Sequence, residues 1–478
     1  MLFIAILGLV GLSVSSPLGS PLVGIEEEYA KEGMDLTELK ADIKELSREV
    51  EEEYKGRNNE LKQLRAAFAK TIHPNETLST VPSINDLNRR AAAELFEGDL
   101  ILTPEQWKIA TDLDPTKPLT RRQALVNAVQ LWSTMGAPIV YYKFHSSCSS
   151  NLRQLMMEGM KYWEERTCIT FQPAPANETA YVLFQSFEEG CFSYIGRLGV
   201  AQAVNIGRGC ECLSIVAHEI SHAFGTAHVQ SRSDRDQYVY VDTENIPENE
   251  AHNFARDPKE YFGELTNYDI PYEFGSMQHY EQFAFAINRN RPSIFARPAY
   301  SDYQYSMESP RATFYDTLLI NRIYKCTDKC RNQITCYNNG VQHGRDCNKC
   351  ACPRGWDGTN CQYRPAGTLT VSVTHSGQLR VELVGPYPGE YQEKLYVLQA
   401  PAGRRIRIHV DAFGDGQVTR CIDYGMDITT ARDTRLTGHK FCSNSHIGDL
   451  ISEGEVALVY LYRASNWDTW ADLTLSLV

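Results

Sequence analysis

Histidine and glutamate residues at metal-ligand spacing occur in the segment from His218 to His222, which reads HEISH. Residues four apart share one face of an α-helix, so the two imidazoles can bind one ion, and the carboxylate of Glu219 lies beside them. Gly225 can adopt the left-handed conformation that ends a helix, which lets the chain bring His228 back as a third ligand. Three nitrogen ligands and a water form a catalytic zinc site, whereas closed structural sites favour cysteine ligands.

This ligand set predicts hydrolysis of peptide bonds. A single bound Zn²⁺ would acidify its water, Glu219 would take the proton as general base, and the hydroxide would attack a peptide carbonyl. Glu219 would then pass the proton to the leaving amine. Five fixed positions, three of them histidine, disfavour a chance pattern on a surface helix. The sequence therefore predicts a zinc-dependent endopeptidase.

A family resemblance follows from a longer stretch. Residues His218 to Tyr238 read HEISHAFGTAHVQSRSDRDQY, which resembles the HExxHxxGxxHxxxRxDRDxY signature of the astacin family of metzincin proteases. The run GSMQHY, from Gly275 to Tyr280, resembles the Met-containing turn of that family. By this resemblance, residues 123–326 form an α+β metzincin catalytic domain. The same resemblance makes Tyr280 a catalytic residue and a displaceable zinc ligand that stabilises the oxyanion.

Two positions depart from the family pattern. Gln278 occupies the usual methionine position and Met277 lies one place earlier, so the floor beneath the zinc ligands must be made differently. The family usually has glutamate after the third histidine, where it anchors the mature N-terminus, whereas this chain has Val229.

A candidate for silencing the site lies upstream. The run FEGD, from Phe96 to Asp99, resembles the FxGD motif of astacin propeptides, whose aspartate occupies the open zinc position. A carboxylate can displace the catalytic water, and Gly98 lets the backbone pass close to the metal. The other interpretation is an ordinary turn before a strand at 100–102. Because the run precedes a basic pair at 121–122, we expect Asp99 to be the latch of a zymogen.

The N-terminal quarter is predicted to be removed in two steps. Residues 1–16 combine an apolar run with small residues, as in a secretory signal peptide. Residues 17–122 would form a propeptide with one or two long solvated helices between 25 and 70, where apolar residues recur at helical spacing. An activating protease would cut after Arg122.

Cysteine content and charge indicate an extracellular protein. The chain has 14 cysteines, an even number, and none precedes Cys148, which is typical of an oxidising compartment. Sequons at Asn75 and Asn177 predict glycosylation. The net charge of −13 argues against nucleic acid as a partner, and beyond the signal peptide no apolar run approaches a membrane span. Expected partners are extracellular or matrix protein substrates.

The C-terminal third is predicted to contain two further modules. Residues 327–361 hold six closely spaced cysteines and resemble a small disulfide-rich EGF-like module; a zinc knuckle is the alternative. Residues 366–478 show strand patterns separated by glycine and proline, which indicate an all-β sandwich that resembles a CUB domain.

The resemblances also imply disulfide pairs. Those implied by the family and module likenesses are Cys168–Cys326, Cys191–Cys210, Cys330–Cys347, Cys336–Cys350, Cys352–Cys361 and Cys421–Cys442. Cys148 and Cys212 are left over, and we expect them to pair near the active-site helix.

Two other functions compete with the endopeptidase. A catalytically inactive secreted binding protein would act through its C-terminal modules, but the zinc motif and Glu219 are intact. A growth-factor-like ligand would use the cysteine-rich module alone and leaves the zinc motif unexplained.

Overall fold

The computed structural model of the chain describes residues 29, 31, 33, 36–54, 58–69, 82–92, 95–110, 131–132, 138–187, 190–256, 268–414, 418, 420–444 and 448–478. Three predicted features lie outside these residues: the signal peptide, the glycosylation site Asn75 and the cleavage site at Arg122. Among the described helices, none is both long enough and apolar enough to cross a lipid bilayer.

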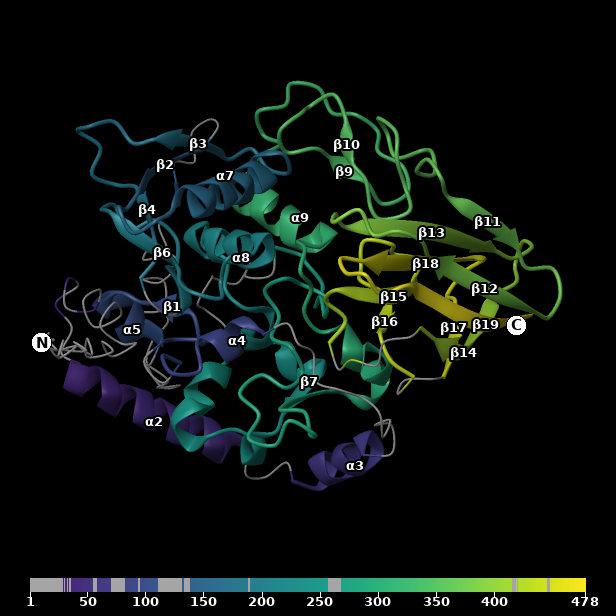
Figure 1. Ribbon diagram of the computed structural model, residues 1–478, viewed down its shortest axis with the longest axis horizontal. Coiled ribbons are helices and arrows are strands. Elements are labelled where there is room, and N and C mark those ends of the chain that lie inside the picture. Colours follow the sequence, from purple (N-terminus) through teal and green to yellow (C-terminus); the bar gives the residue numbers. More distant parts are fainter. Residues whose placement is uncertain are drawn as a thin grey trace, which may run out of the picture.

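A six-stranded mixed sheet forms the upper left of the molecule (Figure 1). Its strands follow the order β1 (Leu100–Ile101), β5 (Cys191–Tyr194), β6 (Gln202–Ile206), β4 (Val182–Gln185), β2 (Ile139–Phe144) and β3 (Thr170–Pro173). Neighbouring strands are parallel except β5 and β6, which are antiparallel. Strand β1 comes from the segment expected to be the propeptide, so that segment extends the sheet beside β5.

Helix α7 (Ser150–Glu164) fixes the position of helix α8 (Leu213–Ala223), which carries the zinc motif. One face of α7 is apolar and buried, as expected of an amphipathic helix. Gly159 allows a close approach, because a Cβ there would lie 2.5 Å from Cγ1 of Val216 on α8. Nε1 of Trp163 also donates a hydrogen bond to a backbone carbonyl of α8 at 2.8 Å. Helix α8 packs in turn against β5 and β6.

The N-terminal segment is helical, as predicted, but its helices are not solvated on all sides. They are α2 (Leu36–Tyr54), α3 (Asn58–Phe68), α4 (Ile84–Leu87) and α5 (Pro104–Ala110). The apolar stripe of α2 is buried against the 3₁₀-helix η4 (Glu248–Phe254) and comprises Leu39, Ile43, Leu46 and Val50. On α3, Nε of Arg65 donates to the carboxylate of Asp242 at 2.8 Å. Helical periodicity shows that a face is apolar, but it does not show what covers that face.

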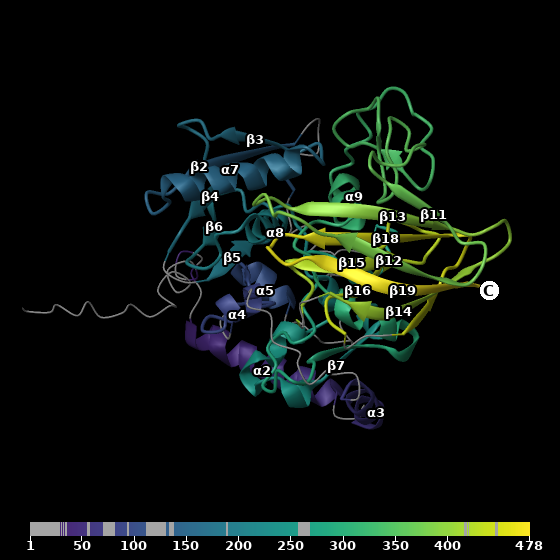
Figure 2. The same ribbon diagram turned by 45° about the vertical axis from the view of Figure 1, so that its right-hand side comes forward.

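The lower part of the peptidase region has little regular structure. Its elements are the 3₁₀-helices η1 (Val229–Ser231), η2 (Arg235–Gln237), η3 (Thr243–Asn245) and η5 (Pro298–Ser306), and the paired strands β7 (Val239–Val241) and β8 (Ile294–Ala296). Helices α2 and α3 run along this part of the molecule (Figure 2). Helix α9 (Phe314–Ile323) lies higher, beside α7 and α8, and its buried residues Ile320 and Ile323 belong to the same apolar cluster as residues of those two helices (Figure 1).

Two further units follow. The cysteine-rich module (residues 330–361) has one short hairpin, β9 (Val341–Gln342) with β10 (Cys350–Ala351). The C-terminal sandwich (residues 366–478) consists of two sheets around one apolar core, as predicted. One sheet holds β11 (Leu369–Ser372), β13 (Gln392–Gln399), β18 (Val456–Arg463), β15 (Tyr424–Thr429) and β16 (His439–Phe441); the other holds β12 (Gly377–Leu383), β19 (Thr469–Leu477), β14 (Ile406–Phe413) and β17 (Asp449–Ile451).

Six disulfides join the pairs that the resemblances implied. The expected pairing of Cys148 with Cys212 is wrong, because both are free thiols. Cys148 is buried, and its Sγ donates to the carbonyl of Phe184 at 3.3 Å. Cys212 is exposed at the start of α8. An even number of cysteines indicated pairing, but it does not place the last two side chains within bonding distance.

We therefore expect the native chain to react with iodoacetamide at Cys212 and not at Cys148. Burial excludes the reagent from Cys148, and it also raises the pKa of that thiol. Peptide mass spectrometry before and after unfolding would show one adduct and then two. Cys212→Ser should remove the native adduct; a native chain that gives no adduct at all would mean that the two thiols pair after all.

Candidate metal centre

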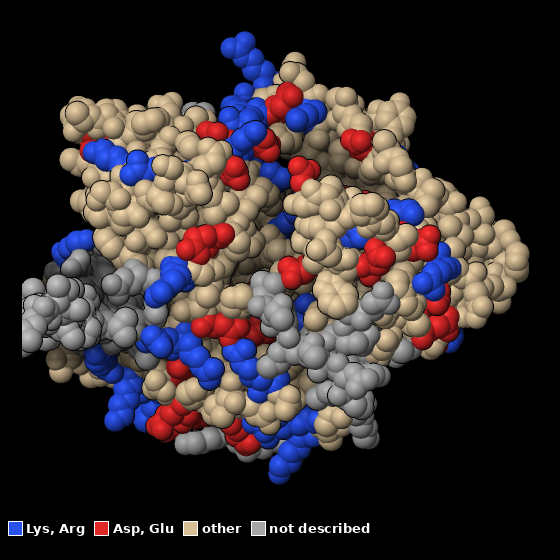
Figure 3. All heavy atoms as spheres, in the orientation of Figure 1, with Lys and Arg blue, Asp and Glu red and all other residues tan. Residues whose placement is uncertain are grey.

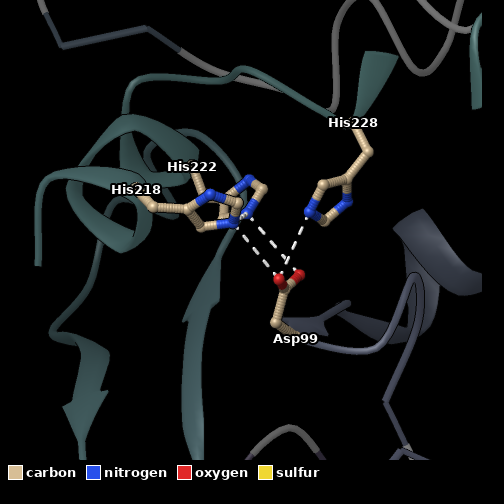
Figure 4. A group of neighbouring side chains, drawn as sticks. All are labelled: Asp99, His218, His222 and His228. Atoms are coloured by element: carbon tan, nitrogen blue, oxygen red, sulfur yellow. Dashed lines mark hydrogen bonds and ion pairs between the residues drawn. The ribbon is translucent and has the colours of Figure 1, made fainter. Parts of the chain in front are cut away.

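Helix α8 presents two of the three histidines and ends as the sequence predicts. Gly225 has a φ of 94°, in the left-handed region that favours glycine. Its N–H donates to the carbonyl of His222 at 2.8 Å, which closes the last turn. The chain then reverses and brings His228 back towards the helix (Figure 4).

The three histidines and Asp99 surround one point (Figure 4). Nε2 of His218 and Nε2 of His222 are 3.0 Å apart, and the four ligand atoms all lie within 4.8 Å of one another. One oxygen of Asp99 is 3.2 Å from Nε2 of His218 and 3.2 Å from Nε2 of His228. The other is 3.5 Å from Nε2 of His222. All four side chains are buried. Four ligand atoms around one point suit a tetrahedral zinc ion.

Each imidazole is oriented by an oxygen atom that contacts Nδ1, the ring nitrogen that faces away from the shared point. The three Nδ1 atoms each lie 2.8 Å from such an atom: His218 from the carbonyl of Met277, His222 from the carbonyl of Thr226, and His228 from the carboxylate of Glu97. Because these oxygens accept hydrogen bonds, we assign the proton to Nδ1 on each ring. The Nε2 lone pairs then face the shared point, which is the arrangement of metal-binding histidines.

The charges around the rings also fit a cation. Burial lowers the pKa of His218 to about 4, so this imidazole is neutral and can act as a ligand. Burial opposes the charged form of His228 as well, but the carboxylates of Asp99 and Glu97 raise its pKa to about 10. The pocket therefore favours a positive charge beside His228, which a metal ion can supply in place of a proton.

Asp99 is held in the site by the backbone on both sides of it. Gly98 has a φ of 75°, and a Cβ at this position would lie 2.8 Å from the ring of Phe285. The carbonyl of Gly98 accepts a hydrogen bond from the side chain of Asn88 at 2.8 Å, and its N–H donates to Asn253 at 2.8 Å. Strand β1 begins at the residue after Asp99. Only glycine fits at position 98, as the sequence predicts.

Sequence reasoning missed Glu97. Its carboxylate contacts both Nδ1 and the backbone N–H of His228, at 2.8 and 3.2 Å, and it is fully buried. Its carbonyl accepts a hydrogen bond from the hydroxyl of Tyr280. The residue lies inside the FEGD run, but only the three-dimensional path of the chain shows what its side chain contacts.

Glu219 lies buried beside the histidines, with no hydrogen-bond partner for either carboxylate oxygen among the described residues. Burial, and after it the negative charge of Asp99, raises the pKa of Glu219 well above its usual value. A buried carboxyl group without donors is suited to exchange a proton, as a general base must.

Gln278 connects the Met-containing turn to helix α8. Its Nε2 donates to Oγ of Ser221 at 2.5 Å and to the carbonyl of His218 at 3.2 Å. Met277 instead packs in the same apolar cluster as residues of α8 such as Ile220. This chain therefore has the hydrogen bonds of Gln278 to the ligand-bearing helix in addition to the apolar packing of Met277.

Asp316 was also missed. Oγ of Ser276 donates to its carboxylate at 2.5 Å, and the N–H of Met277 donates to it at 3.0 Å, so Asp316 holds the turn from the side of α9. The pattern Thr313-x-x-Asp316 predicts a helix cap, which is formed. Val229, at the other departure from the family pattern, donates its N–H to the carbonyl of Gln278 at 2.8 Å.

Comparisons with known proteins agree with this geometry. The family model described as "Astacin", a family of peptidases, matches residues 124–325. "Zinc metalloproteinase nas-23" of Caenorhabditis elegans is 34% identical over 405 residues, covering 82% of this chain and 73% of that protein. "Zinc metalloproteinase nas-28" of the same organism is 34% identical over 287 residues, covering 59% of this chain and 56% of that protein.

A solved structure is also similar. It is a hatching-enzyme zinc-protease of the medaka fish Oryzias latipes, High choriolytic enzyme 1, with 31% identity and a TM-score of 0.37. The similarity covers 41% of this chain and 94% of the hatching-enzyme chain.

Replacing Gln278 with alanine should destabilise the chain by about 1–3 kcal/mol, because two hydrogen bonds to α8 are lost and a small cavity remains. Urea unfolding followed by fluorescence would measure this change. Gln378, exposed on β12, offers a matched control: Gln378→Ala should change the free energy of unfolding by less than about 0.5 kcal/mol. Equal stabilities of the two variants would show that Gln278 does not support the helix.

Proposed function

Because the chain belongs to the astacin family of zinc metallopeptidases, we propose that it is a secreted endopeptidase made as a precursor, in which Asp99 silences a single-zinc centre. The observation that carries this proposal is the carboxylate of Asp99 lying among the three Nε2 atoms. It holds the position that a catalytic water must occupy.

In the active form, His218, His222 and His228 would hold the zinc ion, which when bound supplies a Lewis acid that acidifies water. Glu219 accepts the proton of the attacking water and returns it to the leaving amine. The hydroxyl of Tyr280 donates a hydrogen bond to the oxyanion that develops on the peptide carbonyl. The three histidines surround one buried point, and the side chains of Glu219 and Tyr280 are buried as well.

The segment that carries Asp99 blocks a catalytic hydroxyl as well as the open ligand position. The hydroxyl of Tyr280 is engaged by the carbonyl of Glu97 and is not available to a substrate. Burial alone would raise the pKa of Asp99, but the imidazoles of His228 and His222 lower it well below its usual value, so this residue is a carboxylate. Release requires that β1 leave the sheet edge and that α2 leave its apolar site on η4.

The remaining assignments extend the proposal to the whole chain. Residues 17–122 are the propeptide, cut by an activating protease after Arg122, and residues 123–326 are the peptidase domain. The cysteine-rich module and the C-terminal sandwich serve as EGF-like and CUB-like units, and extracellular or matrix proteins are the substrates. Asn177 is exposed and can accept a glycan. On the face drawn in Figure 3, positive and negative side chains are interspersed, which suits protein substrates better than a polyanion.

An inactive binding protein remains the second candidate. No observation favours it, because the described residues include a complete set of ligands, base and hydroxyl donor.

Glu219→Ala should abolish cleavage of casein by the processed chain, with a loss of at least about 10³-fold, while zinc remains bound because no ligand is removed. Fluorescent casein and a zinc assay would measure the two quantities. Equal cleavage by both forms would remove Glu219 from the mechanism, and no cleavage by either would favour the inactive protein.

Asp99→Ala should give a precursor with partial activity, because water regains its position at the metal. The variant is combined with Arg121→Ala and Arg122→Ala so that cleavage at the basic pair cannot supply the activity. The same double arginine variant with Asp99 intact is the control. If the Asp99 variant bound zinc and stayed as silent as this control, Asp99 would not be the latch.

A further inference from the structure

The Met-containing turn lies between helix α8 and the C-terminal sandwich. At the start of the turn, Gly275 is in direct contact with Thr437 of the sandwich. A Cβ on Gly275 would lie 2.3 Å from Oγ1, 2.5 Å from Cγ2 and 2.6 Å from Cβ of Thr437. The three atoms nearest to such a Cβ therefore all belong to one side chain of the C-terminal sandwich.

A buried carboxylate joins the same two segments. Glu273 accepts a hydrogen bond from the N–H of Gly275 at 3.0 Å and from the N–H of Thr437 at 3.1 Å. The side chain is 3% exposed. Without the sandwich, this carboxylate would lose one of its donors and face solvent.

The surrounding contacts fix the sandwich against the peptidase region. Oγ of Ser306 donates to the carbonyl of Gly438 at 3.0 Å and accepts from the N–H of Lys440 at 3.0 Å. Nζ of Lys440 donates to the carbonyl of Glu308 at 2.6 Å, and the guanidinium of Arg420 pairs with the Glu308 carboxylate at 2.7 Å. Strand β16 lies along η5 in this interface. Several of these polar groups are buried, and such groups hold one geometry once they are satisfied.

The Met-containing turn contributes two groups to the zinc site. The carbonyl of Met277 orients the ring of His218, and Tyr280, the proposed oxyanion donor, is the last residue of the turn. A shift of the turn therefore moves one ligand and one catalytic hydroxyl together.

We propose that the C-terminal sandwich is part of the catalytic unit, and that Thr437 is a positioning residue that sets the Met-containing turn through Gly275. The effect on catalysis rests on the proposed function, whereas the effect on the metal site does not. The sandwich then acts on the reaction in addition to any contact it makes with substrates.

The test uses the processed full-length chain with Gly275→Ala, Thr437→Gly and the double variant. Gly275 lies outside the positive-φ region, so alanine strains no backbone there, and the three atoms nearest to its Cβ all belong to Thr437. Threonine is β-branched and cannot turn all of its atoms away. Gly275→Ala should lower kcat by roughly 10- to 100-fold with little change in KM, because displacement by about 1 Å costs this much in a catalytic site.

The double variant should return kcat to within about threefold of Thr437→Gly alone, which is the coupling expected of residues in contact. The rate of zinc transfer to a chelator should follow the same order, faster for Gly275→Ala and restored in the double variant. If Gly275→Ala does not fold while the double variant does, the contact is equally supported.

The proposal is overturned if Gly275→Ala matches the parent chain in both kcat and zinc release, or if the double variant shows no recovery. Should neither alanine variant fold, Glu273→Gln decides, because its amide places an NH2 donor opposite an N–H group where a carboxylate oxygen accepted a hydrogen bond: unchanged kcat and zinc release would overturn the proposal. A parent chain that cleaves nothing would end the proposed function, and zinc release alone would then test the contact.

Discussion

The orientation of three imidazole rings is the constraint on which the rest of the structure depends. Nε2 atoms face one another only because each Nδ1 is held by an oxygen at 2.8 Å. Those oxygens come from three places: the loop after α8, the Met-containing turn and the segment around Glu97. The peptidase region and the segment around Glu97 together bring these three oxygens to the three imidazoles.

Much of this arrangement could be predicted because it depends on local spacing. The HEISH run places two ligands on one face, Gly225 ends the helix, and the FEGD run needs glycine close to the metal. Strand patterns in the C-terminal third also predicted a sandwich. In each case the relevant residues lie within a few positions of one another, where backbone geometry alone relates them.

The features that could not be predicted depend on contacts between distant segments. Glu97 contacts His228 across more than a hundred residues, and the amide of Gln278 finds its acceptors on α8. The burial of α2 requires a partner surface on η4, which helical periodicity does not reveal. The predicted disulfide between Cys148 and Cys212 was wrong for the same reason, because the number of cysteines does not give the distance between two of them.

Glu97 and Asp99 also determine the charge balance of the centre. Both residues belong to the same four-residue run. A single cleavage of the chain, followed by release of that segment, would therefore remove both carboxylates from a fully buried site. The imidazoles, the ion and Glu219 would then remain without these two counter-charges. Activation would thus leave the centre more electropositive as well as open, and it would do so where negative charge develops on a substrate carbonyl. In the proposed precursor, these two carboxylates would offset the positive charge of the centre until the segment leaves.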